Sequence, residues 1–242
     1  HKAKVEGLTW AAPVYAKLSL KDKETGKVID SKSVRVAELP KMTRRYSYIV
    51  DGQEYQVDHQ WQLKPGAYTR RRLSGELETR FQTAEKRSFD ITFDEANKQF
   101  RMEYGSGKAK IPLYPLMQAM GVEDSTLEKT WGKEILDANK NIRNAASAVD
   151  QFYKTTKKQA PPGTAEAHKH LRDTLHGSKL RPDSTEITLG KPLDNVTGEA
   201  LTLATRKMLD VQAGHPEDDR DSVVFKDLRG VGDYAYDKLM GN

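Results

Sequence analysis

The sequence contains no cysteine, which excludes disulfide bonds and thiolate metal sites. A chain without disulfides fits a reducing compartment such as the cytoplasm, where we expect this protein to act. No apolar run approaches the length of a membrane span, and no signal peptide is visible. With 36% hydrophobic and 31% charged residues, the 242-residue chain has the composition of a soluble globular protein with one large or two smaller domains.

Signatures of catalysis are missing as well. No serine lies in the strand–turn–helix elbow that a nucleophile requires. The stretch 105–108 lacks the upstream glycine and the following Ser or Thr of a phosphate-binding loop, so we interpret it as a flexible hairpin exit. His168 and His170 would project to opposite sides of a helix and cannot easily share a metal ion.

The acidic run at residues 217–221 resembles a metal site in composition, because carboxylates bind hard cations. It lacks the glycine-containing loop that orders such ligands. We interpret it as a hydrogen-bonded, charge-paired junction between two parts of the chain. The sequence thus predicts no catalytic residue, no metal site and no cofactor in this chain.

Basic residues are concentrated in the first half of the chain. Residues 1–112 hold 22 Lys and Arg against 15 Asp and Glu, whereas residues 113–242 hold 18 against 20. The excess gathers in clusters at residues 41–45, 70–72, 86–87 and 108–110. A one-sided excess suits a phosphate backbone, because counterion release adds to affinity. A solvated surface without a ligand is the alternative.

The spacing of apolar residues predicts strands first and helices afterwards. Alternation at residues 14–20 and 34–36, and in the pair 89–93 and 100–104, indicates strands. From Pro112, which can begin a helix that Gly121 ends, the spacing becomes helical.

Several features define the helical part. Ser125 and Glu128 are spaced as a capping box, and a long amphipathic helix follows with its apolar face running from Ile135 to Phe152. We expect further helices at residues 164–176, 199–212 and 231–239, with an irregular stretch at 180–195.

The stretch 39–69 carries the most functional information. Residues 46–50 alternate as in a half-buried strand. The dipeptide Asp51-Gly52 that follows suits a type I′ hairpin, since both central residues of that turn need positive φ. A return strand through Tyr55 and Val57, followed by a turn at residues 64–66, completes a polar, aromatic hairpin.

This stretch resembles, without a gap, a segment of the β (second-largest) subunit of multisubunit DNA-directed RNA polymerases. In that family a P-L-M-T segment leads to a short strand, an I-N-G-x-E turn and then S-Q-x-H-x-S-P-G-x-Y. The residues that match at the same spacing are Pro40, Met42, Thr43, Gly52, Glu54, Gln60, Pro65, Gly66 and Tyr68, and Ile49 lies one position before the family's Ile. Asp51 replaces the usual Asn, and His59, Gln62 and Leu63 depart from the family pattern.

Three further segments resemble the family in the same order. A charged turn at residues 23–26 comes first, and residues 88–122 resemble a strand pair followed by a K-[LI]-P start, a short apolar helix and an A-L-G stop. Residues 218–233 resemble D-D-x-D-H-x-x-N-[RK]-R-V-R-x-x-G-[ED], with Ser222, Phe225 and Asp227 as departures. Agreement in order across four segments makes chance a poor explanation.

The resemblance implies an α+β fold in two parts. In the family, a β-rich protrusion domain is interrupted by an inserted lobe domain and resumes near the D-D-x-D motif. Carried over, residues 1–70 and 217–242 form the protrusion-like part, and residues 71–216 form a mainly helical, lobe-like insertion. Residues near 60–68 should then lie in the same domain as residues near 221–233. The start at His1 rather than Met is expected of a processed product or a piece of a longer chain.

The resemblance also implies a role in transcription. The chain would be a non-catalytic part of a DNA-directed RNA polymerase, a nucleotidyltransferase whose Mg²⁺-dependent chemistry belongs to other parts of the assembly. Its partners would be the remaining β-type segment, a β′-type subunit, DNA and nascent RNA, without a membrane. Divergence from the family points to a bacteriophage enzyme. The alternatives are a phage virion or regulatory protein of this fold that binds nucleic acid or a host polymerase, and an unrelated binding module associated with a helicase or nuclease.

We expect the DNA-facing surface on the basic hairpin and at its exit. The candidate DNA-binding residues are Lys41, Arg44, Arg45, Lys64, Tyr68, Arg70, Arg71, Arg72 and Arg229. The adjacent arginines 70–72 repel one another, so they need either phosphates or local acids, and Glu76 and Glu78 are the acids at hand. If the arginines meet phosphates, their removal should change stability little, because exposed ion pairs contribute about 0–1 kcal/mol each.

Aromatic residues near these cations have two possible roles. Trp10, Trp61 and Tyr68 could stack on bases, as aromatic residues do in single-strand binders. Aromatic residues in strands are more often part of a core, and we assign Trp10 to the core. Tyr68, beside the arginine cluster, is assigned to the DNA surface, with the core as its alternative.

Overall fold

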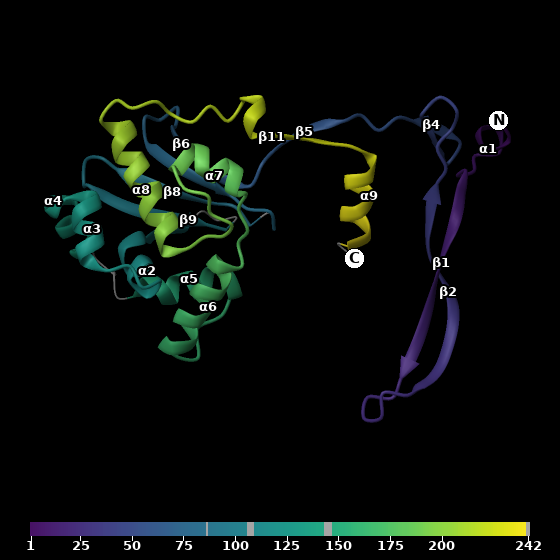
Figure 1. The fold of residues 1–242 in the computed structure, drawn as a ribbon, viewed down its shortest axis with the longest axis horizontal. Helices are drawn as coiled ribbons and strands as arrows, with labels where there is room; N and C mark the ends of the chain where they lie inside the picture. The colour runs from purple at the N-terminus through teal and green to yellow at the C-terminus, as the bar shows by residue number, and fades with distance from the viewer. Residues whose placement is uncertain (86, 106–108, 143–146, 241–242) are drawn as a thin grey trace. The chain divides into compact units, whose positions relative to one another are not determined.

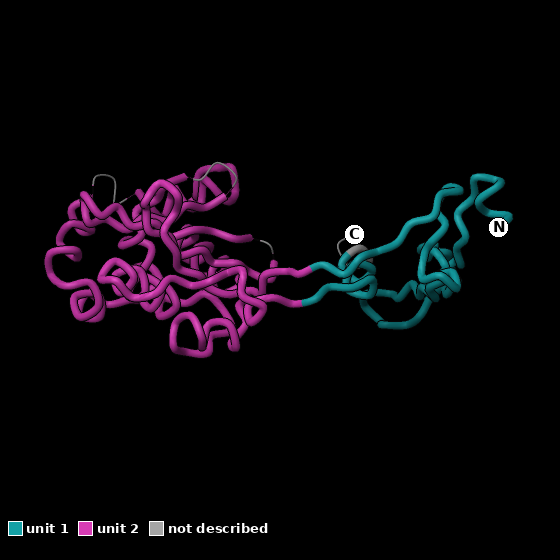
Figure 2. The backbone as a smooth tube through the Cα atoms, turned by 90° about the horizontal axis from the view of Figure 1, so that it is seen from above, with its two compact units in different colours: residues 1–60, 228–242 teal, residues 61–227 magenta. Residues whose placement is uncertain are grey.

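The computed structural model describes residues 1–85, 87–105, 109–142 and 147–240 (Figure 1). Contacts divide the chain into two compact units, of which unit 1 comprises residues 1–60 and 228–242 and unit 2 comprises residues 61–227 (Figure 2). Helices and antiparallel sheets are both present, so the predicted α+β class is confirmed. The boundaries implied by the family resemblance, near residues 70 and 216, stay predictions.

Unit 1 contains two hairpins and two helices. β1 (Ala11–Lys21) and β2 (Val28–Pro40) form a long antiparallel hairpin, and β3 (Tyr48–Val50) and β4 (Gln53–Tyr55) form a short one. The helices are α1 (Lys2–Val5) and α9 (Val231–Met240). The strands predicted at residues 14–20 and 34–36 lie within β1 and β2, and the helix predicted at 231–239 lies within α9.

The short hairpin has the turn predicted from its sequence. Asp51 and Gly52 have φ values of 49° and 79°, the two positive angles that a type I′ turn needs. Space requires glycine there too, since a Cβ at Gly52 would lie 2.8 Å from the Cα of Gly7. The strand predicted over residues 46–50 is shorter than expected, because Tyr46 has a φ of 58° and lies in a turn before β3. Val57, predicted to lie in the return strand, follows the end of β4.

Unit 2 is built on a five-stranded antiparallel sheet with the strand order β10-β9-β8-β7-β6. Its strands are β6 (Gly66–Arg71), β7 (Leu77–Gln82), β8 (Phe89–Asp94), β9 (Gln99–Tyr104) and β10 (Ala109–Pro112). Phe81, Ile91 and Met102 are fully buried on one face. Alternate positions such as Arg70 and Arg80 lie on the other face, as the two-residue period of a strand requires. The predicted strand pair is confirmed as β8 and β9.

Helices cover the apolar face of this sheet (Figure 1). They are α2 (Leu113–Ala119), α3 (Asp124–Trp131), α4 (Lys133–Lys140), α5 (Ala148–Lys157), α6 (Thr164–His176), α7 (Pro182–Leu189) and α8 (Gly198–Gln212). Helices predicted at residues 113–120, 164–176 and 199–212 are confirmed as α2, α6 and α8. Gly121, with a φ of 85°, follows α2 as expected of a helix stop. In the described part of the chain, no helix has the length and apolar character needed to span a bilayer.

Two predictions about helix starts are wrong. Ser125 does not cap a helix, because α3 already begins at Asp124 and the Ser125 hydroxyl donates to Glu123 instead. The stretch 180–195 is not irregular throughout, because α7 begins at Pro182. The fixed φ of proline and its missing N–H suit the first helical position, and this was the signal overlooked there.

The single long helix predicted from Ile135 to Phe152 is also wrong. α4 ends at Lys140 and α5 begins at Ala148, while residues 143–146 lie outside the described part of the chain. The helical spacing continues across the break because both helices pack against the same sheet, α4 against β9 and α5 against β10. Asn139 marks the end of α4, where its buried amide accepts from the Phe100 N–H at 2.8 Å.

The chain passes between the units twice, and the two passages pair with each other. β5 (Gln60–Leu63) and β11 (Lys226–Arg229) form a two-stranded sheet, and a 3-10 turn, η2 (Val223–Phe225), precedes β11. The Lys64 N–H donates to the Phe225 carbonyl at 2.8 Å. Residues 61–68 and 221–227 belong to unit 2, as the predicted shared domain requires, whereas residues 228–233 belong to unit 1.

Candidate nucleic-acid interface

Three of the predicted DNA-binding cations lie near the turn that precedes β3. Arg44 and Arg45 are exposed, and no ion pair to either is present among the described residues. Lys41 is exposed too, and its ammonium lies 6.0 Å from the centre of the Trp10 ring. Trp10 is 42% exposed, so its assignment to the core is wrong. The pair places a cation on an accessible aromatic face, which is compatible with binding a polyanion.

Lys64 and Tyr68 are directed inward instead. The Lys64 ammonium donates to Asp183 at 3.2 Å and to the Val224 carbonyl at 2.9 Å. Tyr68 is fully buried, its hydroxyl donates to the Lys64 carbonyl at 2.8 Å, and its ring meets Phe225 edge-on at 5.2 Å. Burial raises the pKa of Tyr68 to about 12. The prediction that Tyr68 faces DNA is corrected, since a fully buried ring cannot stack on a base.

Arg70 and Arg72 meet local acids, as the alternative reading of the arginine cluster anticipated. The Arg70 Nε lies 2.5 Å from Glu78, and Arg72 contacts Glu76 at 2.9 Å and Glu78 at 2.5 Å. Arg72 also reaches Glu103 on β9, at 3.0 Å. These contacts form an ion-pair network on the polar face of the sheet.

The acids of this network are buried while the arginine heads are partly exposed. The side chains of Glu78 and Glu103 are 3% and 2% exposed, against 20% for Arg72. Burial opposes ionisation of both carboxyls, but hydrogen bonds from Arg72, together with Arg70 at Glu78 and Lys110 at Glu103, keep both pKa values below the usual range. Because the acidic partners of Arg72 are not solvent-exposed, we expect the removal of Arg72 to lower stability.

Arg71 lies at the end of the edge strand β6. Its guanidinium contacts Glu95 at 2.7 Å, and both side chains are more than a third exposed. Its backbone N–H donates to Glu217 at 2.9 Å. Asp218 completes the arrangement by accepting from the Thr69 N–H at 2.8 Å and lying 3.6 Å from the Lys207 ammonium. The acidic run thus covers the free edge of β6 with the predicted hydrogen bonds and ion pair. These partners all belong to unit 2, so its role as a junction between domains stays a prediction.

Arg229 lies on β11 and is largely covered. Its guanidinium donates to Asp237 at 3.1 Å and lies 5.1 Å from the centre of the Tyr234 ring. The side chain is 18% exposed. The structure thus leaves Lys41, Arg44 and Arg45 as the predicted cations with neither a carboxylate contact nor burial in the described part of the chain.

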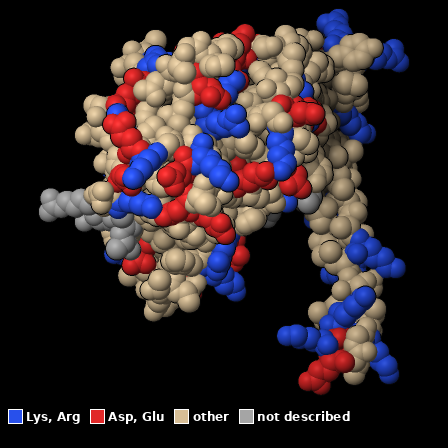
Figure 3. All heavy atoms as spheres, turned by 60° about the vertical axis from the view of Figure 1, so that its left-hand side comes forward, with Lys and Arg blue, Asp and Glu red and all other residues tan. Residues whose placement is uncertain are grey.

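The polar face of the sheet holds further cations that the sequence did not single out. Arg80 and Arg220 lie near Arg70. Burial lowers the pKa of Arg220, and so do the nearby positive charges of Arg70 and Arg80. The pairing of β6 with β7 places Arg80 near Arg70, and the chain brings Arg220 there from about 150 positions away, so spacing in the sequence did not signal them. Figure 3 shows basic and acidic side chains interspersed over the face of unit 2 that it presents. This pattern differs from a purely basic nucleic-acid groove.

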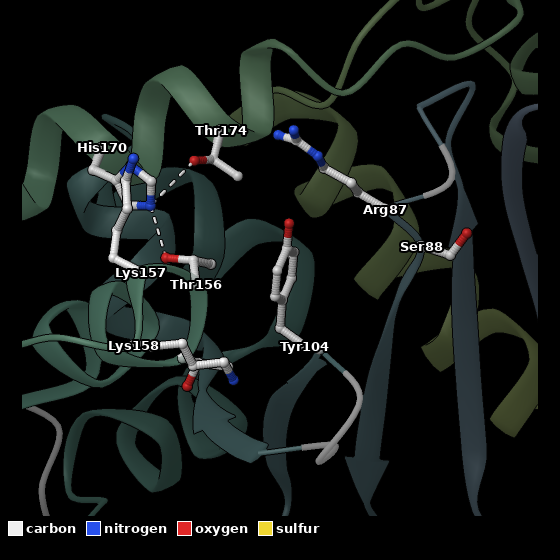
Figure 4. Close-up of a pocket in the computed structure, with 10 residues that line it drawn as sticks. Arg87, Ser88, Tyr104, Thr156, Lys157, Lys158, His170 and Thr174 are labelled. Atoms are coloured by element: carbon white, nitrogen blue, oxygen red, sulfur yellow. Dashed lines mark hydrogen bonds between the residues drawn. The ribbon is translucent and has the colours of Figure 1, made fainter. Parts of the chain in front are cut away.

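A hollow of about 560 Å³ opens between α5, α6 and the ends of β8 and β9 (Figure 4). Among the described residues that line it, the cations are Arg87, Lys157 and Lys158, and none is a carboxylate. The His170 Nε2 meets the Thr156 hydroxyl at 2.7 Å. Burial, and then Lys157, lower the pKa of His170, so the imidazole is neutral near pH 7. The hollow suits a small anion better than a metal ion.

Among the described residues, no group of three or more His, Cys, Asp or Glu side chains is placed to hold a metal ion. His168 and His170 line different hollows. The glycine-containing stretch at 105–108 lies outside the described residues except for Gly105.

Comparison with known proteins identifies distant relatives, although no family model matches the chain. It is 24% identical over 261 residues, 98% of its length, to the DNA-directed RNA polymerase subunit beta of Prochlorococcus marinus (strain NATL1A). It is 26% and 28% identical, over 74% of its length, to the same subunit of Synechococcus sp. (strain CC9902) and Parasynechococcus marenigrum (strain WH8102). The chain is similar to RNA polymerase β subunits.

The similarity is partial with respect to the relatives. The chain spans 17% of the length of the Synechococcus and Parasynechococcus β subunits and 24% of that from Prochlorococcus marinus. Homology to β subunits supports a role related to RNA polymerase.

Proposed function

We propose that this chain forms the N-terminal, protrusion-and-lobe part of a β-type subunit of a multisubunit DNA-directed RNA polymerase in the cytoplasm. It would line the nucleic-acid cleft during transcription and take no part in bond formation. The observation that carries the proposal is the similarity to a β subunit over 98% of the chain.

The pairing of β5 with β11 supports this proposal. It joins the S-P-G-like segment to the D-D-x-D-like segment, which are separated by more than 150 residues in the sequence. An inserted domain between two parts of a protrusion requires such a junction. The Mg²⁺ that nucleotidyl transfer needs would be held by other polypeptide segments of the polymerase, because this chain offers no arranged carboxylate set among its described residues.

The exposed apolar residues of the long β1–β2 hairpin support the proposal that this chain has a protein partner. Ala16, Leu18, Leu20 and Val34 lie on one face of β1 and β2, which also carries Lys32 and Asp30 opposite the two leucines. Leu18 and Leu20 are 55% and 62% exposed. A two-stranded hairpin with an uncovered apolar face is marginally stable alone. We propose that the remaining β-type segment covers this face and that a β′-type subunit completes the assembly.

Co-purification tests this assembly. The chain is expressed with the remaining β-type segment and the β′-type subunit, and the complex is assayed for template-directed RNA synthesis with and without the chain. Leu18→Asp with Val34→Asp should abolish co-purification, because both changes place charge on the apolar face. Ser33→Asp, on the opposite face of the hairpin, is the matched control and should co-purify.

The salt dependence of DNA binding tests whether the chain contacts DNA in the cleft. Replacing Lys41, Arg44 and Arg45 with Ala in the assembled polymerase should lower the slope of log K against log salt by about 0.9 for each lost phosphate contact on duplex DNA. Sequence preference should not change, because phosphate contacts carry no base information. A chain that joins no polymerase segment and adds nothing to RNA synthesis would defeat the proposal.

A further inference from the structure

The turn before β3 is a tight hairpin loop of three residues. Met42 and Tyr48 pair as an antiparallel bridge. The Thr43 N–H donates to the Ser47 carbonyl at 2.8 Å, and the Tyr46 N–H donates to the Thr43 carbonyl at 3.1 Å. Residues 44–46, Arg-Arg-Tyr, form the tip. In loops of this kind the last residue adopts the left-handed conformation, where glycine is the usual choice.

Tyr46 occupies this glycine position. Its φ is 58°, which places its Cβ close to the backbone and strains a residue with a side chain. Its side chain gains nothing from burial in return, because Tyr46 is 74% exposed. Strain at an exposed position indicates a constraint other than folding, and such residues gather at binding sites.

Side-chain hydrogen bonds from residues at the base of the loop hold its backbone in place. The Thr43 hydroxyl oxygen accepts from the Arg45 N–H at 3.2 Å and from the Ser47 N–H at 3.3 Å. Ser47 is 3% exposed, and its hydroxyl donates to Glu54, which also contacts Lys4. Hydrogen bonds from Lys4 and Ser47 lower the pKa of Glu54, so this anchor stays charged at neutral pH. These hydrogen bonds therefore fix the backbone of the loop, and with it the position of the Tyr46 Cα, before any ligand arrives.

We infer that this loop binds single-stranded nucleic acid, with the Tyr46 ring stacked on an unpaired base and Arg44 and Arg45 on the neighbouring phosphates. An aromatic ring between cations is the arrangement by which proteins hold single strands, since every base offers a π-face. In a duplex those faces are covered by neighbouring base pairs, so a rigid exposed tyrosine gains little there. The inference deepens the proposed function and rests on it for the source of the strand, template or transcript.

The test uses the full chain and fluorescence anisotropy with a labelled single-stranded oligonucleotide of mixed sequence. Tyr46→Gly should weaken binding by roughly 5- to 100-fold, the range expected for one lost stacking contact. Its melting temperature should stay the same or rise, because glycine relieves the left-handed strain. Affinity for duplex DNA and the salt slope should not change, since the arginines remain.

Two control variants separate stacking from other effects. Tyr46→Phe keeps the ring and should retain wild-type affinity. Tyr15→Ala removes another exposed tyrosine of unit 1, 61% exposed, and should bind as the wild type does. DNA and RNA oligonucleotides of the same sequence, measured side by side, show which strand the loop prefers.

The outcomes distinguish this inference from the proposed function. If Arg44→Ala with Arg45→Ala weakens binding while Tyr46→Gly does not, the stacking role is wrong and the basic surface stands. If Tyr46→Gly lowers the melting temperature and leaves binding unchanged, the tyrosine is structural. If the chain binds no nucleic acid yet assembles into a polymerase, the inference fails alone. If binding depends on Tyr46 but no assembly forms, the proposed function fails alone.

Discussion

At the scale of single residues, burial decides what each member of the arginine cluster does. The sequence correctly identified Glu76 and Glu78 as partners, because they lie within a few positions of the arginines. It could not identify Glu103, which strand pairing brings from β9. Tyr46 shows the same limit, since alternation over residues 46–50 favoured a strand while the actual loop depends on hydrogen bonds made by Thr43 and Ser47.

The first residue-scale prediction concerns Arg72. Arg72→Met should lower the free energy of unfolding by about 2–4 kcal/mol, because it leaves buried Glu78 and Glu103 without their main counter-charge. Arg71→Met is the matched control and should cost less than about 1 kcal/mol, since its pair with Glu95 is exposed. Urea unfolding of both variants measures the difference. Equal losses would show that the network does not depend on burial.

The same ion-pair network predicts that the free energy of unfolding depends on pH. The pKa values of Glu78 and Glu103 are lowered in the folded state, so their contribution to stability is present above the unfolded value near 4.5. It is lost as pH falls through the lower, folded pKa values. The free energy of unfolding of the wild type should therefore decrease below about pH 5 more steeply than that of Arg72→Met. Urea titrations between about pH 3 and 7 compare the two; parallel curves would contradict the assignment.

At the scale of elements, apolar spacing located most helices and strands but not their breaks. The stretch from Ile135 to Phe152 keeps one apolar face although two helices share it, because both pack on one sheet. Pro112 and Gly121 located α2 because their effect on the backbone is local. Spacing therefore predicts which face an element buries more reliably than where the element ends.

The prediction at this scale concerns the hydrogen bond that joins α8 to α3. The buried Trp131 indole donates to the Thr205 hydroxyl at 2.8 Å, which joins α3 to α8. Thr205→Val keeps the side-chain shape but leaves the indole N–H unpaired, so it should lower stability by about 1–3 kcal/mol. Thr205→Ser keeps the acceptor and should lose less. Thermal unfolding of the two variants and the wild type, followed by circular dichroism, checks the order, and a more stable Val variant would contradict it.

At the scale of the whole molecule, the resemblance to β subunits predicted an inserted part, and the pairing of β5 with β11 is what such an insertion needs. The surface residues were harder to predict. Lys41, Arg44 and Arg45 are exposed, whereas Tyr68 is buried and Arg229 is largely covered. A sequence motif fixes neighbours along the chain but not what covers a side chain.

The two units should differ in resistance to proteolysis. Unit 2 has a continuous buried core, whereas the β1–β2 hairpin is exposed along nearly its whole length. Segments with few buried contacts open at low free-energy cost. Brief trypsin treatment of the full chain should therefore cut first at the hairpin lysines such as Lys17, Lys21 and Lys32, and leave residues 61–227 largely intact.

The arginines at 70–72 are an internal control, because the sheet and its ion pairs protect their backbone. Adding the remaining β-type segment should slow cutting in the hairpin if that segment covers its apolar face. Early cleavage at residues 70–72 would show that the edge of the sheet, rather than the hairpin, is the least stable part of the chain.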